Sequence, residues 1–244
     1  MISLVFNLAL LSTVACIYIV RHREDVSIVG GIDIDIKEAP HQISLQLYGS
    51  HACGGSILDN DIIITAAHCL LLSNNTEDFT IRAGSSSHDE GGESTRSKQI
   101  HHPLTYSDVV KPIDMANAGE DIPDEEECSV TGWGLLKVFF PIISGGVCIP
   151  KHLQGVVILK VNDDKCYEAY KQLNPVTERM VCAGVPQGGK SACNGDSGGP
   201  LVYNNKLHGI VSWGYGCAKP GYPTVFSKVS ALRNWIDENI AKLK

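Results

Sequence analysis

Short strand-like runs separated by turn residues extend along almost the whole chain, and this pattern limits the fold more than any other feature. Within the runs, apolar residues alternate with polar ones or cluster over a few positions. Such runs favour an all-β fold. They are 41–49 (HQISLQLYG), 61–69 (DIIITAAHC), 79–85 (FTIRAGS), 128–134 (CSVTGWG), 206–214 (KLHGIVSWG) and 224–230 (TVFSKVS).

The end of the chain follows a different period. Apolar residues recur there at steps of three and four, which predicts a helix with one apolar face. They are Val229, Leu232, Trp235, Ile236, Ile240 and Leu243.

Length and charge narrow the class of protein. The 244 residues, 43% of them hydrophobic, are enough for one large or two small domains with a real core. The net charge of −7 argues against nucleic-acid binding, which needs a basic face to neutralise phosphates.

The first 20 residues carry no charge and resemble a signal for export. Thr13-Val14-Ala15 supplies the small residues that signal peptidase prefers, which predicts a signal peptide over 1–15 and a secreted, extracellular protein. The alternative is an uncleaved membrane anchor, because 20 apolar residues can span a bilayer and Arg21-His22-Arg23 follows them. Otherwise no membrane association is expected.

Nine cysteines and an exported context make disulfides the default interpretation. The sequence contains no CxxC pair, the spacing that would suggest a metal site. His101-His102 and the acidic cluster Asp89, Glu90 and Glu93 have no ligand spacing and are interpreted as surface residues, so we expect no metal and no cofactor. Asn74 opens a single glycosylation sequon.

The chemistry is concentrated in two short stretches. In Cys193-Asn194-Gly195-Asp196-Ser197-Gly198-Gly199-Pro200, a serine between glycines on a tight turn can expose its hydroxyl. The backbone N–H groups of Gly195 and Ser197 can then point at one spot where an oxyanion would form. In Thr65-Ala66-Ala67-His68-Cys69, a cysteine can anchor the neighbouring histidine, which would act as general base.

Together with their surroundings, these stretches resemble the chymotrypsin/trypsin family of secreted serine proteases. The resemblance covers most of the chain after the leader and follows the family's order of motifs. They are Ile28-Val29-Gly30-Gly31, Cys53-Gly54-Gly55-Ser56, Ala66-Ala67-His68-Cys69, Gly132-Trp133-Gly134, Gly195-Asp196-Ser197-Gly198-Gly199-Pro200 and Ser212-Trp213-Gly214.

The family implies two antiparallel Greek-key β-barrels with the active site between them and a C-terminal helix. Ser197 would be the nucleophile, His68 its base, and the N–H groups of Gly195 and Ser197 the oxyanion hole. Asp196 would pair with the amino group of Ile28 after cleavage. Ser212, Trp213 and Gly214 would hold the substrate backbone as an added strand.

The resemblance also implies three disulfides: Cys53 with Cys69, Cys166 with Cys182, and Cys193 with Cys217. Cys16 lies before the protease domain. Cys128 matches a position that is paired in some relatives, but the usual partner position holds Tyr203. Cys128 and Cys148 either pair with each other or remain free.

The chain departs from the family where the orienting aspartate should lie. The strand that carries it should follow a His-Pro pair such as His102-Pro103, but here Pro103 is joined directly to Leu104. We therefore expect an incomplete first barrel. Asp114 is 46 positions after His68, near the family spacing, but its neighbours match the loop after the missing strand, so Asp114 and Asp108 are interpreted as solvated loop residues.

Two further departures concern activation and a loop. Ser27 precedes Ile28, where family zymogens place Arg or Lys, so the activating protease either tolerates Ser or does not exist. The apolar run 138–143 (VFFPII) lengthens a loop that is normally short and polar, and it could bind a partner. A retained intron beside a skipped exon would explain both this run and the missing strand.

The pocket residues also differ from those of trypsin. Ser191, followed by Ala192, stands where cleavage after Arg or Lys needs an acid. Gly214 leaves the entrance open, and Thr224 replaces a glycine and narrows the interior. These residues predict an apolar pocket of small or medium size.

Two functions follow from the sequence. The first is a secreted, monomeric serine endopeptidase, with a propeptide over 16–27 and a protease domain over 28–244, impaired by the missing strand. Its partners would be peptide or protein substrates and an activating protease that cleaves before Ile28. The alternative is a non-catalytic homologue that binds a partner through the old cleft or the apolar run.

Overall fold

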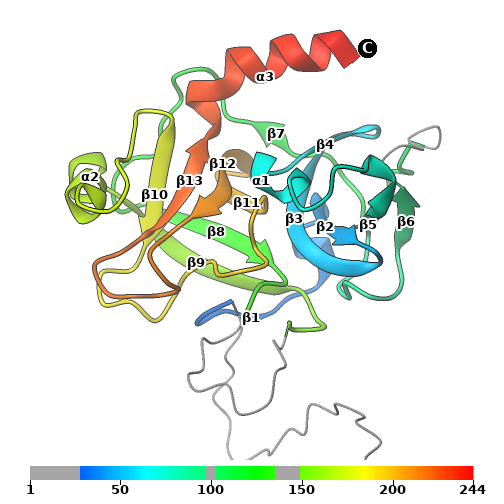
Figure 1. Ribbon diagram of the computed structural model, residues 1–244, viewed down its shortest axis with the longest axis horizontal. Coiled ribbons are helices and arrows are strands. Elements are labelled where there is room, and N and C mark those ends of the chain that lie inside the picture. Colours follow the sequence, from blue (N-terminus) through cyan, green and yellow to red (C-terminus); the bar gives the residue numbers. More distant parts are fainter. Residues whose placement is uncertain (1–27, 97–102, 136–148, 244) are drawn as a thin grey trace, which may run out of the picture.

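The computed structural model describes residues 28–96, 103–135 and 149–243 of the chain. They form two β-sheets that lie side by side, with a long C-terminal helix across one end of both (Figure 1). The predicted all-β class and the C-terminal helix are confirmed. The leader, 97–102 and the apolar run at 138–143 lie outside the described residues, as does Cys148.

The first sheet contains five strands, and every pair of neighbours is antiparallel. In β5, side chains alternate between the core and partial exposure, as the sequence pattern predicts. A two-residue turn at Tyr48 and Gly49, both with positive φ, joins the strand that ends at Leu47 to the strand that begins at Ser50. Their order in the sheet is β4 (Ile62–Ile64), β3 (Ser50–Asp59), β2 (Gln42–Leu47), β5 (Phe79–Ala83) and β6 (Glu93–Arg96).

This first sheet is curled but open. Among the described residues, β4 and β6 each pair with a single neighbour, so nothing joins the two outer edges. The expected incomplete first barrel agrees with this arrangement.

Six strands of the second sheet form a closed barrel. The ring closes because β9 pairs with both β8 and β10. The barrel strands are β8 (Glu127–Gly132), β9 (Gln154–Val161), β10 (Met180–Gly184), β13 (Thr224–Lys228), β12 (Lys206–Trp213) and β11 (Pro200–Tyr203). Outside the ring, β1 (Ile32–Asp33) pairs with β9, and β7 (Asp114–Met115) runs parallel to β12.

The helices are few. They are η1 (Ile36–Glu38), α1 (Ala67–Leu70), η2 (Thr76–Asp78), α2 (Asp163–Tyr170) and α3 (Val229–Leu243). The apolar face of α3 buries Val229 and Ile236 against the core of the first sheet. Within the described ranges, no helix has the length and apolar character needed to span a bilayer.

Candidate active site

Ser197 lies on a tight loop that leads into β11. Gly198 has a φ of +81° in this loop, and a Cβ on it would lie 2.1 Å from Oγ1 of Thr65 and 2.6 Å from the carbonyl oxygen of Gly54. Only glycine can therefore bring the serine this close to the first sheet. The loop is also held to the second barrel, because Gly198 N–H donates to the carbonyl of Val211 at 2.8 Å.

The same contacts bring the segment that contains His68 to the Ser197 loop. The N–H of Gly54 donates to the carbonyl of Ser197 at 2.8 Å, and the Thr65 hydroxyl donates to the carbonyl of Gly54 at 2.8 Å. Sγ of Cys69, the residue after His68, lies 3.7 Å from the carbonyl oxygen of Ser197. The segment that carries His68 and the loop that carries Ser197 therefore meet between the two sheets, although Cys69 and Ser197 are 128 positions apart in the chain.

Three disulfides stabilise the loops around this junction. Cys53 is bonded to Cys69 beside His68, and Cys193 is bonded to Cys217 beside the serine loop. The third joins Cys166 of α2 to Cys182 of β10. These are the pairings that the family resemblance implies. Cys128 is buried and unpaired among the described residues.

Asp196 points away from the junction and is completely buried. Its carboxylate accepts hydrogen bonds of 2.8 Å from the N–H groups of Gly134 and Cys193. Burial nevertheless raises its pKa to about 7, because these two dipoles do not replace full solvation of the charge. A cation next to this carboxylate would reverse that shift.

The segment that begins at Ile28 packs against the stretch that precedes Asp196 in the chain. Ile28 is fully buried in the apolar cluster that also contains Ala192, four residues before Asp196. The carbonyl of Val29 accepts a hydrogen bond of 3.1 Å from the N–H of Ser191. Ile28 and the stretch just before Asp196 therefore lie in the same part of the second barrel.

The N–H groups of Gly195 and Ser197 make no hydrogen bond to any described residue. Gly195 has a φ of +96° and Ser197 is half-buried, so this stretch of backbone borders the site. The two donors therefore stay available for an oxygen atom of a ligand.

One residue that the sequence analysis missed supports this loop. His51 of β3 is buried, with Nδ1 2.7 Å from Oγ of Ser44 and Nε2 3.1 Å from the carbonyl oxygen of Gly195. Burial lowers its pKa to about 4, which keeps the ring neutral. No motif marks this histidine, because its partner Gly195 is 144 positions away.

The residues predicted to line the pocket lie just before Cys193, at the end of β12 and at the start of β13. Ser191 and Ala192 are buried, and the Ser191 hydroxyl donates to the carbonyl of Ala192 at 2.7 Å and accepts from the N–H of Ala218 at 2.6 Å. Thr224 is buried at the start of β13. Ser212 and Trp213 end β12, and Gly214 follows them on the surface.

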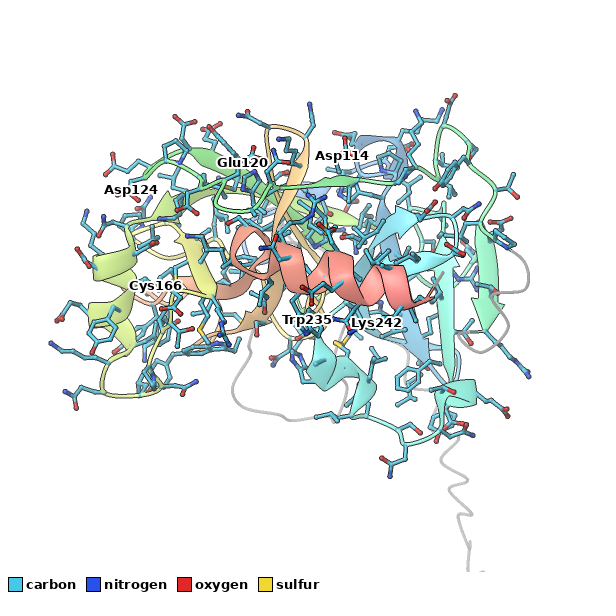
Figure 2. All side chains as sticks on the ribbon, turned by 90° about the horizontal axis from the view of Figure 1, so that it is seen from above. Asp114, Glu120, Asp124, Cys166, Trp235 and Lys242 are labelled. Carbon is cyan, nitrogen blue, oxygen red and sulfur yellow. A yellow bond between two sulfur atoms is a disulfide. The ribbon has the colours of Figure 1, made fainter. Side chains whose placement is uncertain are left out.

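No hydrogen bond or ion pair joins Asp108 or Asp114 to His68 among the described residues. Asp114 is exposed in β7, where its backbone lies opposite Lys206 of β12. In Figure 2 it lies on the opposite side of α3 from α1. Asp108 is 89% exposed and forms an ion pair with Lys111. Both are solvated as predicted, although Asp114 lies in a strand rather than a loop.

His68 itself is exposed on α1. No carboxylate among the described residues forms an ion pair or hydrogen bond with its side chain. The imidazole therefore lacks an acidic partner within the described part of the chain.

Two β-sheets with a histidine and a serine at their junction are the architecture of a two-barrel serine protease. The family model for trypsin matches residues 28–236. The chain is 45% identical to a vitellin-degrading protease of Bombyx mori, covering 90% of this chain and 88% of the relative. It is 37% identical to trypsin 5G1 of Aedes aegypti (88% and 86%) and 39% identical to hypodermin-B of Hypoderma lineatum (88% and 88%).

The chain belongs to the chymotrypsin/trypsin family of serine endopeptidases, which act on protein or peptide substrates. The alignment with the Bombyx mori protease runs over 240 positions. It covers only 90% of this 244-residue chain, so it contains more positions than residues of this chain. The chain therefore has gaps against that relative.

Proposed function

We propose that the protein is a secreted serine endopeptidase that forms an acyl-enzyme on Ser197. Oγ of Ser197 attacks the carbonyl carbon of the scissile peptide, and Nε2 of His68 accepts the hydroxyl proton and passes it to the leaving amine. Water then adds to the ester with His68 as general base and releases the acid. The N–H groups of Gly195 and Ser197 bind the oxyanion.

The observation that carries this proposal is the set of contacts that join Thr65, Gly54 and Ser197. Hydrogen bonds of 2.8 Å from Thr65 to the carbonyl of Gly54, and from the Gly54 N–H to the carbonyl of Ser197, connect the segment between β4 and His68 to the backbone of the serine loop. The glycine at 198 makes this approach sterically possible.

The missing acidic partner predicts a weak enzyme. A carboxylate holds the imidazole in one tautomer and stabilises its charged form, and its loss costs about 10⁴ in kcat in a well-studied enzyme of this type. The exposure of His68 adds to this cost, because water competes with the serine hydroxyl to donate a hydrogen bond to the imidazole nitrogen.

The pocket supports cleavage after small or medium apolar residues. Ser191 is buried, and its hydroxyl already bonds to Ala192 and Ala218, so it offers no charge to a lysine or arginine side chain. Thr224 occupies volume that a glycine would leave free. The backbone after Trp213 would bind the substrate as an added strand, on the side where Gly214 is exposed.

Activation would follow cleavage between Ser27 and Ile28. The new ammonium group would approach the buried carboxylate of Asp196 and lower its pKa from about 7, which would order the Gly195 loop. In this proposal 1–15 is a signal peptide, 16–27 a propeptide and 28–244 a monomeric, extracellular protease domain. The activator would have to accept Ser27.

His68 is exposed and has no acidic partner among the described residues, which also favours a second function, that of a non-catalytic homologue that binds a partner through the cleft. Labelling with a fluorophosphonate separates the two functions. The test protein would begin at Ile28, and Ser197→Ala would be the blank. Labelling that depends on Ser197 supports the enzyme. A folded protein that resists labelling supports the binding homologue.

A further inference from the structure

One polar side chain on the loop between α1 and β5 has no partner among the described residues. Asn74 is exposed on this loop, and its amide forms no hydrogen bond to the described part of the chain. Its neighbours are engaged. The Ser73 hydroxyl donates to the carboxylate of Asp78 at 2.6 Å. Oδ1 of Asn75 accepts from the N–H of Glu77 at 3.1 Å. The loop is therefore held in shape without the Asn74 amide.

Asn74 also opens the sequon Asn74-Asn75-Thr76, the spacing that accepts an N-linked oligosaccharide. Such a glycan is bulky, so its asparagine has to lie on the surface once the protein has folded. Asn74 meets this requirement, and Asn75 and Thr76 are exposed as well. The sequon lies between strands rather than within one, since β4 ends at Ile64 and β5 begins at Phe79. A glycan here would disturb no strand pairing.

The residues just before the sequon form an apolar patch. Leu70, Leu71 and Leu72 are 50%, 82% and 53% exposed, and we call them the leucine patch. Leu72 is two positions before Asn74, so their Cα atoms are at most about 7 Å apart. Consecutive exposed apolar side chains promote association of a protein in water. An oligosaccharide on Asn74 would reach the leucine patch and separate it from other molecules.

We infer that Asn74 carries an N-linked oligosaccharide that covers the leucine patch. In the transfer, the amide nitrogen of Asn74 forms a bond to the anomeric carbon of the first sugar, an N-acetylglucosamine. The bond from that carbon to the pyrophosphate of a lipid-linked donor breaks, and the pyrophosphate departs with the electron pair. The amide nitrogen loses one proton to a base of the transferring enzyme. Nothing is oxidised or reduced in this step.

This inference rests on export, which the proposed function includes, and not on catalysis. The test protein is the full chain with Ser197→Ala, secreted from insect cells, so that no cleavage by the protein itself affects the result. A second version replaces residues 1–15 with an established secretion signal. It carries the test of Asn74 even where the natural leader fails, so a failure of export is distinguished from a failure of glycosylation.

The first measurement locates the sugar. Treatment with a peptide N-glycosidase should lower the mass of the secreted protein and convert Asn74 to an aspartate, which peptide mass spectrometry detects. Asn74→Gln and Thr76→Ala should each abolish the change in mass, whereas Asn75→Gln and Thr76→Ser should keep it. Asn75→Gln is the matched control, because it makes the same chemical change one position away. A secreted protein without sugar on Asn74 would overturn the inference.

The second measurement tests whether the sugar covers the leucine patch. Fluorescence of the apolar dye bis-ANS should be at least about twofold higher with Asn74→Gln than with Asn75→Gln, because the patch is then open to water. Adding Leu71→Ser to Asn74→Gln should remove most of this rise, since Leu71 is the most exposed of the three leucines. Equal fluorescence of the two asparagine variants would overturn the covering of the patch. A rise that Leu71→Ser leaves unchanged would overturn it as well, because the dye would then bind elsewhere.

Discussion

Nε2 of His51 lies 3.1 Å from the carbonyl oxygen of Gly195, so a side chain of the first sheet supports the loop that carries the nucleophile in the second. A carbonyl oxygen only accepts, which means that Nε2 holds the proton. Nδ1 then accepts from the Ser44 hydroxyl at 2.7 Å. The ring thus connects the sheets in one tautomer.

Replacing this histidine should loosen the site. His51→Ala would remove both hydrogen bonds and leave a buried carbonyl without its donor. We expect a loss of about 1–3 kcal/mol of unfolding free energy and at least a tenfold slower labelling of Ser197. Urea unfolding and fluorophosphonate labelling measure the two effects. His152→Ala is the matched control, because His152 is exposed, and equal effects of both variants would refute the role of His51.

The same histidine predicts a dependence of stability on pH. Burial lowers the pKa of His51 from 6.5 to about 4, so the unfolded chain binds more protons between these values. The contribution of the neutral ring is complete above pH 6.5 and is lost as the pH falls to about 4. It amounts to roughly 3 kcal/mol. The difference in unfolding free energy between pH 7 and pH 5, measured with urea, should be smaller for His51→Gln than for the unchanged protein. An equal difference in the two proteins would contradict this assignment.

The buried carboxylate of Asp196 should make the free energy of unfolding depend on pH with the opposite sign. Its pKa is raised from 3.8 to about 7 in the folded chain, so its favourable contribution is present below pH 3.8 and is lost as the pH rises through 7. An ammonium group on Ile28 would restore that contribution at high pH.

The protein that begins at Ile28 should therefore be more stable than the full-length chain at pH 8, by more than about 2 kcal/mol, with a smaller gap at pH 5. Urea unfolding of both forms at the two pH values is the measurement. Asp196→Asn should remove the pH dependence of the gap. A gap that stays constant with pH would rule out the proposed ion pair.

Asp114 should have no part in catalysis. It is exposed in β7 and lies across α3 from α1 (Figure 2). We expect Asp114→Asn to keep the labelling rate within about twofold, whereas His68→Ala should lower it by about 10³ or to the detection limit. A large loss in Asp114→Asn, with unchanged unfolding free energy, would show that Asp114 reaches the site in solution.

The side chain of Thr224 should limit the size of accepted substrates. Thr224→Gly removes a buried, branched side chain beside the predicted pocket. We expect kcat/KM for peptides with Phe at the cleavage position to rise at least tenfold relative to Ala, since such volume differences correspond to about 1–3 kcal/mol. A peptide library with matched flanking residues measures this ratio. An unchanged ratio would place Thr224 outside the pocket.

Much of the fold could be predicted because its signals are local. The alternation in 79–85 and the three- and four-residue steps after 229 reflect the side-chain periods of a strand and a helix, and both elements are present. The role of Gly198 could also be predicted locally, since a serine on a tight turn needs a neighbour with positive φ.

The sequence alone determined the class of fold and the motifs of the family. Only the tertiary structure decided which distant groups meet. His51 contacts a carbonyl 144 positions away, Asp114 lies on the wrong side of α3, and the edges of β4 and β6 run in the same direction. The physical reason is that periodicity and turn chemistry act over a few residues, whereas such contacts depend on how the packed sheets orient their strands and loops.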